Sequence, residues 1–219
     1  MQVFVTGSTG FVGANLVRLL LQKGYAVKAL VRDGSNLDNL QGLEVEIVKG
    51  DLNDPDLAQQ MAGCQYLFHV AALYSLWQAD AEALYHHNVL GTRNVLLSAR
   101  KAGIKRTVYT SSVAAIGAGN NGQVVDESYQ SPVEKLVGHY KKSKFLAERE
   151  AMAAVAAGQD VVVVNPSTPI GPRDIKPTPT GDMVLRFLRR GMPTYLETGM
   201  KFIDVRDVVE GHVLALLKG

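Results

Sequence analysis

The chain has 219 residues, enough for one large domain or for one domain with a small appendage. With 47% hydrophobic and 20% charged residues and a net charge of +2, it gives no reason to expect nucleic acid or a membrane surface as a partner. The single cysteine, Cys64, excludes an intrachain disulfide, and no Cys/His spacing suits a metal such as zinc. No segment approaches the ~18 apolar residues of a membrane span or has the pattern of a signal peptide, so we expect a cytoplasmic protein.

The N-terminal segment has the pattern of a strand over residues 2–6, a glycine turn and an amphipathic helix that ends at Gly24. Gly7 allows a tight turn, Gly10 lets main-chain N–H groups approach a pyrophosphate, and Gly13 brings helix and strand close together. The first turn of the helix would present unpaired N–H groups and a positive dipole end to this anion. The pattern predicts a dinucleotide-binding loop whose contact residues are Gly7, Thr9, Gly10, Phe11, Val12 and Gly13.

Strand and helix patterns alternate through the rest of the chain. Apolar runs predict strands over 27–31, 43–49, 65–70, 106–110 and 161–164, and helical periodicity predicts helices over 54–61, 80–102, 133–157, 181–191 and 207–218. This alternation predicts an α/β fold, a doubly wound parallel sheet of Rossmann type with strand order 3-2-1-4-5-6. We expect an NAD(P)-binding domain over 1–170, and over 171–219 a truncated substrate-binding portion followed by a final helix that packs on the Rossmann sheet.

Candidate catalytic residues lie at the carboxyl edge of this sheet, where doubly wound folds bind their ligands. Tyr140 and Lys144 are four residues apart on a predicted helix and therefore share one face. A phenol with a pKa near ~10 is a poor acid or base at neutral pH, but a nearby ammonium and a bound oxidised nicotinamide favour its phenolate. Tyr140 would then exchange a proton with a substrate oxygen, to which Ser112 at the end of the fifth strand would donate a hydrogen bond.

Several short motifs occur in a fixed order along the chain: Thr6-Gly7-x-x-Gly10-x-x-Gly13, Gly50-Asp51-Leu52, His69-Val70-Ala71-Ala72, Asn88-Val89-x-Gly91-Thr92-x-Asn94, Tyr109-Thr110-Ser111-Ser112, Tyr140-x-x-x-Lys144 and Asn165-Pro166-Ser167. Together they resemble the extended short-chain dehydrogenase/reductase family, also described as the NAD-dependent epimerase/dehydratase family. The chain is most similar to its dihydroflavonol-reductase-like members, which include hopanoid-associated sugar epimerases, because of the run from Asn165 to Asp174 and the Gly138-His139-Tyr140 segment. The resemblance covers residues 1 to about 219.

The resemblance implies a catalytic triad of Ser112, Tyr140 and Lys144, with Asn88 in a supporting proton relay. It also implies an NAD(P) cofactor, with Asp51 and Leu52 beside the adenine. Outside the glycine loop, the residues expected at the cofactor are Arg32, Ser35, Asp51, Leu52, Ala71, Ala72, Ser111, Tyr140, Lys144, Pro166 and Ser167.

Two features depart from the family pattern. Family members usually continue beyond this length into most of a substrate-binding lobe, so the substrate pocket is expected to be incomplete. NAD-preferring members also have an acidic residue at the end of the second strand, where this chain has Val31 followed by Arg32. A guanidinium there suits a 2′-phosphate, with Ser35 as a second contact, although the neighbouring Asp33 would oppose it. We therefore expect NADP(H) in preference to NAD(H).

Two classes of function remain open at this stage. One is an NAD(P)-dependent oxidoreductase acting on a secondary alcohol or ketone, either a net reductase or a nucleotide-sugar epimerase. The other is a non-catalytic NAD(P)-binding or redox-sensing module. Tyr74, Trp77 and Tyr85 are expected either to line the substrate pocket or to pack in the core, and Arg173 and Lys176 are candidates for contact with an anionic substrate. The helices over 80–102 and 133–157 would form a homodimer interface.

Overall fold

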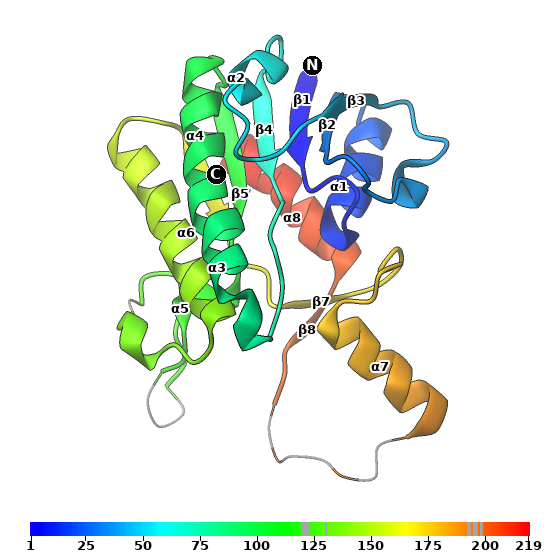
Figure 1. The fold of residues 1–219 in the computed structure, drawn as a ribbon, viewed down its shortest axis with the longest axis vertical. Helices are drawn as coiled ribbons and strands as arrows, with labels where there is room; N and C mark the ends of the chain where they lie inside the picture. Colours follow the sequence, from blue (N-terminus) through cyan, green and yellow to red (C-terminus); the bar gives the residue numbers. More distant parts are fainter. Residues whose placement is uncertain (120–122, 130, 192–193, 195–196, 198) are drawn as a thin grey trace.

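A six-stranded parallel sheet forms the centre of the molecule, with the strand order β3-β2-β1-β4-β5-β6 (Figure 1). The computed structural model describes residues 1–119, 123–129, 131–191, 194, 197 and 199–219. The strands are β1 (Gln2–Thr6), β2 (Ala26–Val31), β3 (Glu46–Lys49), β4 (Tyr66–His69), β5 (Arg106–Thr110) and β6 (Val161–Val164). The predicted doubly wound sheet and its strand order are confirmed.

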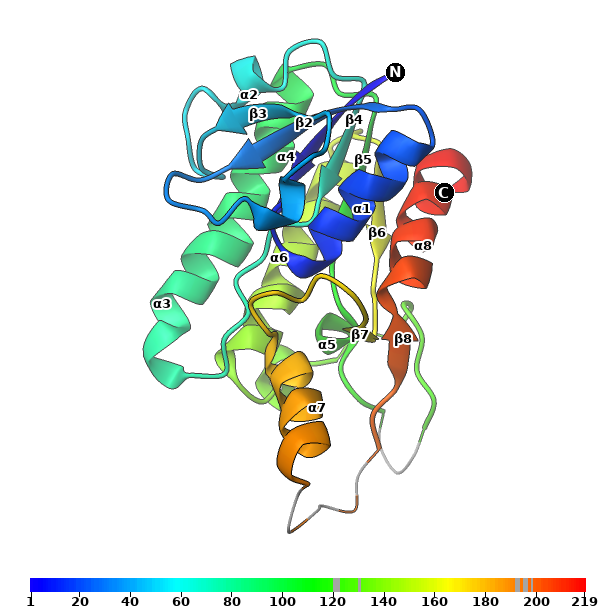
Figure 2. The ribbon, with the colours of Figure 1, turned by 90° about the vertical axis from the view of Figure 1, so that its right-hand side faces the viewer.

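Helices cover both faces of this sheet (Figure 2). On one face α1 (Phe11–Gln22) and α8 (Val205–Lys218) pack over a core that includes Val3 and Val5 of β1. On the other face α2 (Leu57–Gln60) and α4 (Gly91–Lys101) pack over Phe4, and α6 (His139–Ala156) packs over Tyr109. The alternation of Val3, Phe4 and Val5 between the two cores follows from the two-residue period of a strand and explains why β1 is apolar throughout.

Two long helices differ from their predicted ranges. The helix predicted over 80–102 begins as α3 (Ala81–Leu84), widens into a π-helical segment over Tyr85–Leu90 and continues as α4. The helix predicted over 133–157 begins only at His139, because Gly138 has a positive φ of 87° that ends the preceding loop. Residues Val133–Lys135 form a separate 3₁₀ turn.

Two short helices also differ from prediction. The helix predicted from Asp54 is the single turn α2, because the Asp54 carboxylate accepts a hydrogen bond from the Asp51 N–H at 2.7 Å instead of capping a helix. A helix that was not predicted, α5 (Val113–Ile116), follows β5 directly. Ser112 caps α5, since its hydroxyl accepts a hydrogen bond from the Ala114 N–H at 3.1 Å.

The C-terminal segment adds a small layer at the carboxyl ends of the strands (Figure 1). There β7 (Thr168–Ile170) and β8 (Phe202–Asp204) pair in parallel, an arrangement that was not predicted. Helix α7 (Pro179–Arg190) begins earlier than expected, because the Thr178 hydroxyl caps it by accepting from the Gly181 N–H. Among the described residues, no helix has the length and apolar character to cross a membrane, and no three metal-ligating side chains gather.

Candidate active site

The glycine loop between β1 and α1 is built by close backbone contacts. Gly7 has a φ of +70°, and a Cβ at this position would lie 2.6 Å from the Ala71 nitrogen. A Cβ on Gly13 would lie 2.0 Å from the Gly7 carbonyl oxygen. Both positions therefore require glycine for the fold itself, because a side chain there would collide with backbone atoms.

Gly10 differs from these two glycines because it is exposed. A Cβ added to it would approach only the Gly7 oxygen, at 3.3 Å, so a small side chain requires a slight shift of this one oxygen and not the collision that Gly7 and Gly13 would produce. Gly10 is the N-cap of α1, and the helix has neither a side-chain cap nor an acidic residue in its first turn. Its free N–H groups and this open surface form a cradle that fits the pyrophosphate of a dinucleotide.

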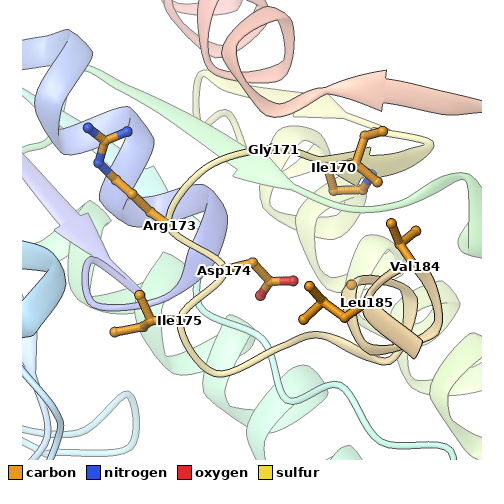
Figure 3. Close-up of a pocket in the computed structure, with 9 residues that line it drawn as sticks. Ile170, Gly171, Arg173, Asp174, Ile175, Val184 and Leu185 are labelled. Atoms are coloured by element: carbon orange, nitrogen blue, oxygen red, sulfur yellow. The ribbon is translucent and has the colours of Figure 1, made fainter. Parts of the chain in front are cut away.

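The loop over residues 172–174, far from the glycine loop in the sequence, is linked to it through Asn39 and Asn15. Asn39 donates to the carbonyl oxygens of Thr9 and Arg173, each at 3.1 Å. Asn15 on α1 donates to the Pro172 oxygen at 3.0 Å and accepts from the Arg173 guanidinium at 3.2 Å. The Arg173 side chain therefore extends toward α1 (Figure 3), and its expected role at an anionic substrate is not favoured by this arrangement.

A pocket of about 320 Å³ lies between this loop and α7. Figure 3 shows the Asp174 carboxylate inside it, facing Val184 and Leu185 of α7. The same carboxylate accepts hydrogen bonds from the Thr178 N–H and hydroxyl at 2.9 to 3.0 Å. Asp174 therefore fixes the start of α7 relative to the loop that supports the cofactor cradle.

The predicted adenosine contacts gather beyond the ends of β2 and β3. Arg32 is exposed directly after β2, and both Arg32 and Asp51 act electrostatically on His87, whose pKa is lowered mainly by burial. Leu52 is buried, and the Ser35 N–H donates to the Arg32 oxygen at 3.1 Å. Asp33 forms an exposed ion pair with Lys49 at 3.3 Å. Among the described residues no carboxylate pairs with Arg32, which leaves its charge open to a ligand.

A buried polar chain lies beneath the predicted groove residues Ala71 and Ala72. The Ala71 N–H donates to the Thr6 hydroxyl at 3.2 Å, and Thr6 bonds to His69 Nδ1 at 2.7 Å. His69 Nε2 bonds to the Thr92 hydroxyl at 3.0 Å. Burial, and next the charge of Lys144, lower the pKa of His69 to about 3, so this ring is neutral. Its two bonds tie β4 to β1 and α4 and hold the groove wall in place.

Tyr140 and Ser112 meet at the carboxyl edge of the sheet. Tyr140 lies in the first turn of α6, and its ring lies 4.5 Å from that of Tyr74, centroid to centroid. Burial, and then Tyr74, raise the pKa of Tyr140 to about 12, while a hydrogen bond with Ser112 acts in the opposite direction. In the protein without cofactor, burial therefore favours the protonated phenol, and the phenolate expected beside a bound oxidised nicotinamide stays a prediction.

Lys144 is only 2% exposed and points into the protein beside β5. Its ammonium donates to the Thr110 oxygen at 2.9 Å and to the Tyr109 hydroxyl at 3.3 Å. Burial lowers the pKa of Lys144 to about 8, and Glu148 opposes this shift. Lys144 shares the helix face of Tyr140 as expected, but its ammonium makes its hydrogen bonds to Tyr109 and Thr110 of β5.

Asn88 connects three segments around Tyr140. Its side chain accepts from the Leu73 N–H at 2.8 Å and donates to the Leu73 oxygen at 3.0 Å. It also donates to the Ser143 hydroxyl at 3.0 Å, which in turn donates to the Tyr140 carbonyl oxygen at 2.8 Å. Asn88 thus joins the π-helical segment, the loop after β4 and the first turn of α6. Its expected proton relay stays a prediction.

Glu148 is a residue that the sequence reasoning missed. Its carboxylate accepts hydrogen bonds from the Ser111 hydroxyl and from the Asn165 side-chain amide, the second at 2.8 Å. The Ser111 hydroxyl is used by Glu148 and the Ser111 N–H donates to the Val164 oxygen at 2.8 Å, so its expected cofactor contact stays a prediction. Glu148 follows Lys144 by four residues, and this spacing was the available signal.

The predicted contacts Pro166 and Ser167 are half-buried in the segment that follows β6. The Pro166 oxygen accepts from the Val113 N–H at 3.1 Å, which aligns this segment with the start of α5. A second pocket, of about 480 Å³, lies nearby between residues 74–77 and the start of α7, and its lining includes Tyr74, Trp77 and Asp182. The carboxyl edge of the sheet therefore has both the cradle and Tyr140, and the ring of Tyr74 connects Tyr140 to this second pocket.

Comparisons with known proteins agree with the fold. The profile of the NAD dependent epimerase/dehydratase family matches residues 3–219. A Synechocystis protein named "Putative dihydroflavonol 4-reductase" is 69% identical over 99% of this chain, which spans 63% of that relative. The crystal structure of gox2253 superposes with a TM-score of 0.94 at 46% identity, covering 99% of this chain and 66% of that one. DesIV, a dTDP-glucose 4,6-dehydratase from Streptomyces venezuelae solved with NAD bound, has a TM-score of 0.86 at 27% identity, covering 100% of this chain and 73% of that one.

Proposed function

The chain belongs to the NAD dependent epimerase/dehydratase family, and from that premise we propose that it is an NAD(P)-dependent oxidoreductase that reduces a ketone to a secondary alcohol. The observation that carries the proposal is the contact between Tyr140 and Ser112, with the buried Lys144 one turn further along α6, at the sheet edge that also has the open glycine cradle. A nicotinamide bound there would exchange hydride with the substrate carbon. The relative named as a reductase supports this direction of the reaction.

The protein groups then handle the proton. Because the pKa of Tyr140 is raised to about 12, its phenol stays protonated at neutral pH and donates its proton to the carbonyl oxygen as a general acid. Ser112 donates a second hydrogen bond to that oxygen and stabilises its developing negative charge. Lys144, as an ammonium, stabilises the phenolate that Tyr140 becomes after the transfer.

Replacement of Tyr140 by Phe tests this proposal. We expect the Tyr140→Phe variant to lose turnover by about a thousandfold, in line with the usual contribution of a general acid. Its affinity for NADPH should change little, because the ring and its contact with Tyr74 remain. Steady-state oxidation of NADPH against a panel of ketones that includes dihydroflavonols measures the first effect, and NADPH fluorescence titration measures the second. If no wild-type turnover depends on Tyr140, a non-catalytic NAD(P)-binding or redox-sensing module replaces the proposal.

We also propose that the cofactor is NADP(H), with NAD(H) as the weaker partner. The support for this is Arg32, which lies exposed at the end of β2 without an acidic partner among the described residues. A guanidinium binds a 2′-phosphate through paired charge-assisted hydrogen bonds. The related DesIV was solved with NAD, so the preference is proposed for this chain alone.

A nucleotide-sugar epimerase is the second candidate, because the matching family model is that of NAD dependent epimerases and dehydratases and the site groups would serve either reaction. The two functions differ in the fate of the cofactor. A reductase consumes NADPH in proportion to product, whereas an epimerase returns hydride to the substrate and retains its cofactor. The mass of the cofactor that co-purifies with the protein distinguishes the two functions. Tightly held NAD would indicate an epimerase, and loosely held NADP would indicate a reductase.

We further propose a homodimer formed by the outer faces of α4 and α6, in the cytoplasm. Leu97 on α4 is 50% exposed, and Met152 on α6 is also 50% exposed, so both faces offer apolar area to a second copy. An ion pair between Arg93 and Glu150 at 2.6 Å links the two helices. The buried, free thiol of Cys64 is compatible with a reducing compartment.

A further inference from the structure

The Glu148 carboxylate lies where α6 meets the segments that follow β5 and β6. It projects from α6 on the helix face of Lys144, one turn further along. Its two described hydrogen-bond donors come from other elements: the Ser111 hydroxyl after β5 and the Asn165 amide after β6. A half-buried carboxylate with donors from two strand ends joins these three segments.

The contacts continue directly to Ser112. The amide nitrogen of Asn165 that binds Glu148 also donates to the Ser112 carbonyl oxygen, at 3.2 Å. The Ser111 N–H donates to the Val164 oxygen at 2.8 Å, which keeps the ends of β5 and β6 in register. Glu148 therefore orients Asn165, and Asn165 fixes the main chain that presents the Ser112 hydroxyl opposite Tyr140.

We propose that Glu148 is a positioning residue that locks Ser112, at the start of α5, to the Tyr140–Lys144 face of α6. Its carboxylate is also the anion one helical turn from Lys144, where it opposes the lowering of the Lys144 pKa by burial. This inference rests on the proposed oxidoreductase function and goes beyond it, because Glu148 acts through Asn165, Ser111 and Lys144. The groups that face the Lys144 ammonium are Glu148 on its own helix, Tyr109 on β5 and the neutral His69 on β4. Glu148 is the anion among them.

Two substitutions separate geometry from charge. Glu148→Gln keeps an oxygen that accepts from Ser111 and Asn165 but removes the negative charge, whereas Glu148→Ala removes both. The matched control is Glu150→Gln, which removes a carboxylate from the same helix, where Glu150 is paired with Arg93 on the surface. Urea unfolding of each variant establishes that it is folded.

For ketone reduction we expect Glu148→Ala to lower kcat about tenfold, the effect of one charge-assisted hydrogen bond, with KM nearly unchanged. Glu148→Gln should recover most of this loss at pH 7. The alkaline limb of its kcat profile should lie about one pH unit below that of the wild type, since the ammonium of Lys144 loses its anionic neighbour. Glu150→Gln should match the wild type in both measurements.

A second readout does not depend on activity. The pH titration of the ¹⁵N-lysine NMR signals, with Lys144 assigned by a Lys144→Met variant, should show a lower midpoint for Lys144 in Glu148→Gln and an unchanged midpoint in Glu150→Gln. An unchanged Lys144 midpoint in Glu148→Gln, or an equal shift in both variants, overturns the inference. If the wild type turns over no ketone, the proposed function has failed, while this titration still decides the role of Glu148.

Discussion

At the scale of single residues, cofactor choice depends on Arg32. The side chain is exposed after β2, and the charge of the nearby Asp33 is engaged with Lys49. An exposed guanidinium and a phosphate dianion attract each other only moderately because water screens them, but the 2′-phosphate is the sole difference between the two cofactors. One residue can therefore set most of the preference.

Replacing Arg32 by Ala should lower kcat/KM for NADPH by about tenfold to a hundredfold, the effect of one or two charge-assisted hydrogen bonds, and leave the value for NADH nearly unchanged. Steady-state kinetics with both reduced cofactors measures the ratio. Arg100→Ala, an exposed arginine on α4, is the control for a general loss of positive charge. A wild-type preference for NADH that Arg32→Ala does not alter would contradict the NADP(H) proposal.

The sequence predicted which helix face Tyr140 and Lys144 share, whereas the pKa of Tyr140 in the free protein depends on packing between distant segments. The four-residue spacing of Tyr140 and Lys144 was enough to place them on one face of α6. The direction of the Tyr140 pKa could not be predicted, because it depends on burial and on the ring of Tyr74, which comes from a loop after β4. Glu148 was missed for a similar reason: its partners, Ser111 and Asn165, lie 37 and 17 residues away in the chain.

At the scale of elements, the β1–loop–α1 unit contains glycines with two different purposes. Gly13 serves the fold, because a Cβ there would lie 2.0 Å from the Gly7 oxygen. Gly10 serves the ligand, because a Cβ there would meet the protein only at 3.3 Å and would project from the exposed cradle. The same substitution at the two positions should therefore have different consequences.

We expect Gly13→Ala to destabilise the protein by more than ~2 kcal/mol, because the β1–α1 contact must open. Gly10→Ala should lose less stability than Gly13→Ala, because only the Gly7 oxygen must shift slightly. It should bind NADPH at least about tenfold more weakly, since its methyl group occupies space that the pyrophosphate needs. Gly211→Ala in α8, with no atom within 4 Å of the added Cβ, is the control. Equal stability losses at Gly10 and Gly13 would show that the fold requires both.

The sequence predicted the six strands of the central sheet well, because most of them are short apolar runs between two turn signals, but it did not predict the pairing of β7 with β8. It predicted helix starts less well, since these depend on single backbone conformations. The positive φ of Gly138 delays α6, and the side chain of Asp54 binds the Asp51 backbone and shortens α2. The π-helical segment over Tyr85–Leu90 was also missed, because one widened turn hardly alters the periodicity of a long helix.

At the scale of the whole molecule, the site forms where the Rossmann sheet meets the layer of α7, β7 and β8. The pocket of about 480 Å³ is lined from both sides, by residues 74–77 after β4 and by Pro179 and Asp182 of α7. Tyr74 connects this pocket to the chemistry, because its ring lies on Tyr140. A substrate that reaches Tyr140 should therefore also cover the opposite end of the pocket, where Trp77 is 78% exposed.

Trp77 is the single tryptophan of the chain and therefore reports on this pocket alone. In the free protein its emission should be that of a water-exposed indole and should be quenched readily by acrylamide. A ketone that the wild type reduces is then added to the Tyr140→Phe variant with NADP⁺. The complex forms without reaction, because NADP⁺ has no hydride to transfer. The emission should then shift to the blue and acrylamide quenching should fall, because the substrate displaces water from the indole. Saturating substrate that leaves both signals unchanged would place the substrate elsewhere than between residues 74–77 and α7.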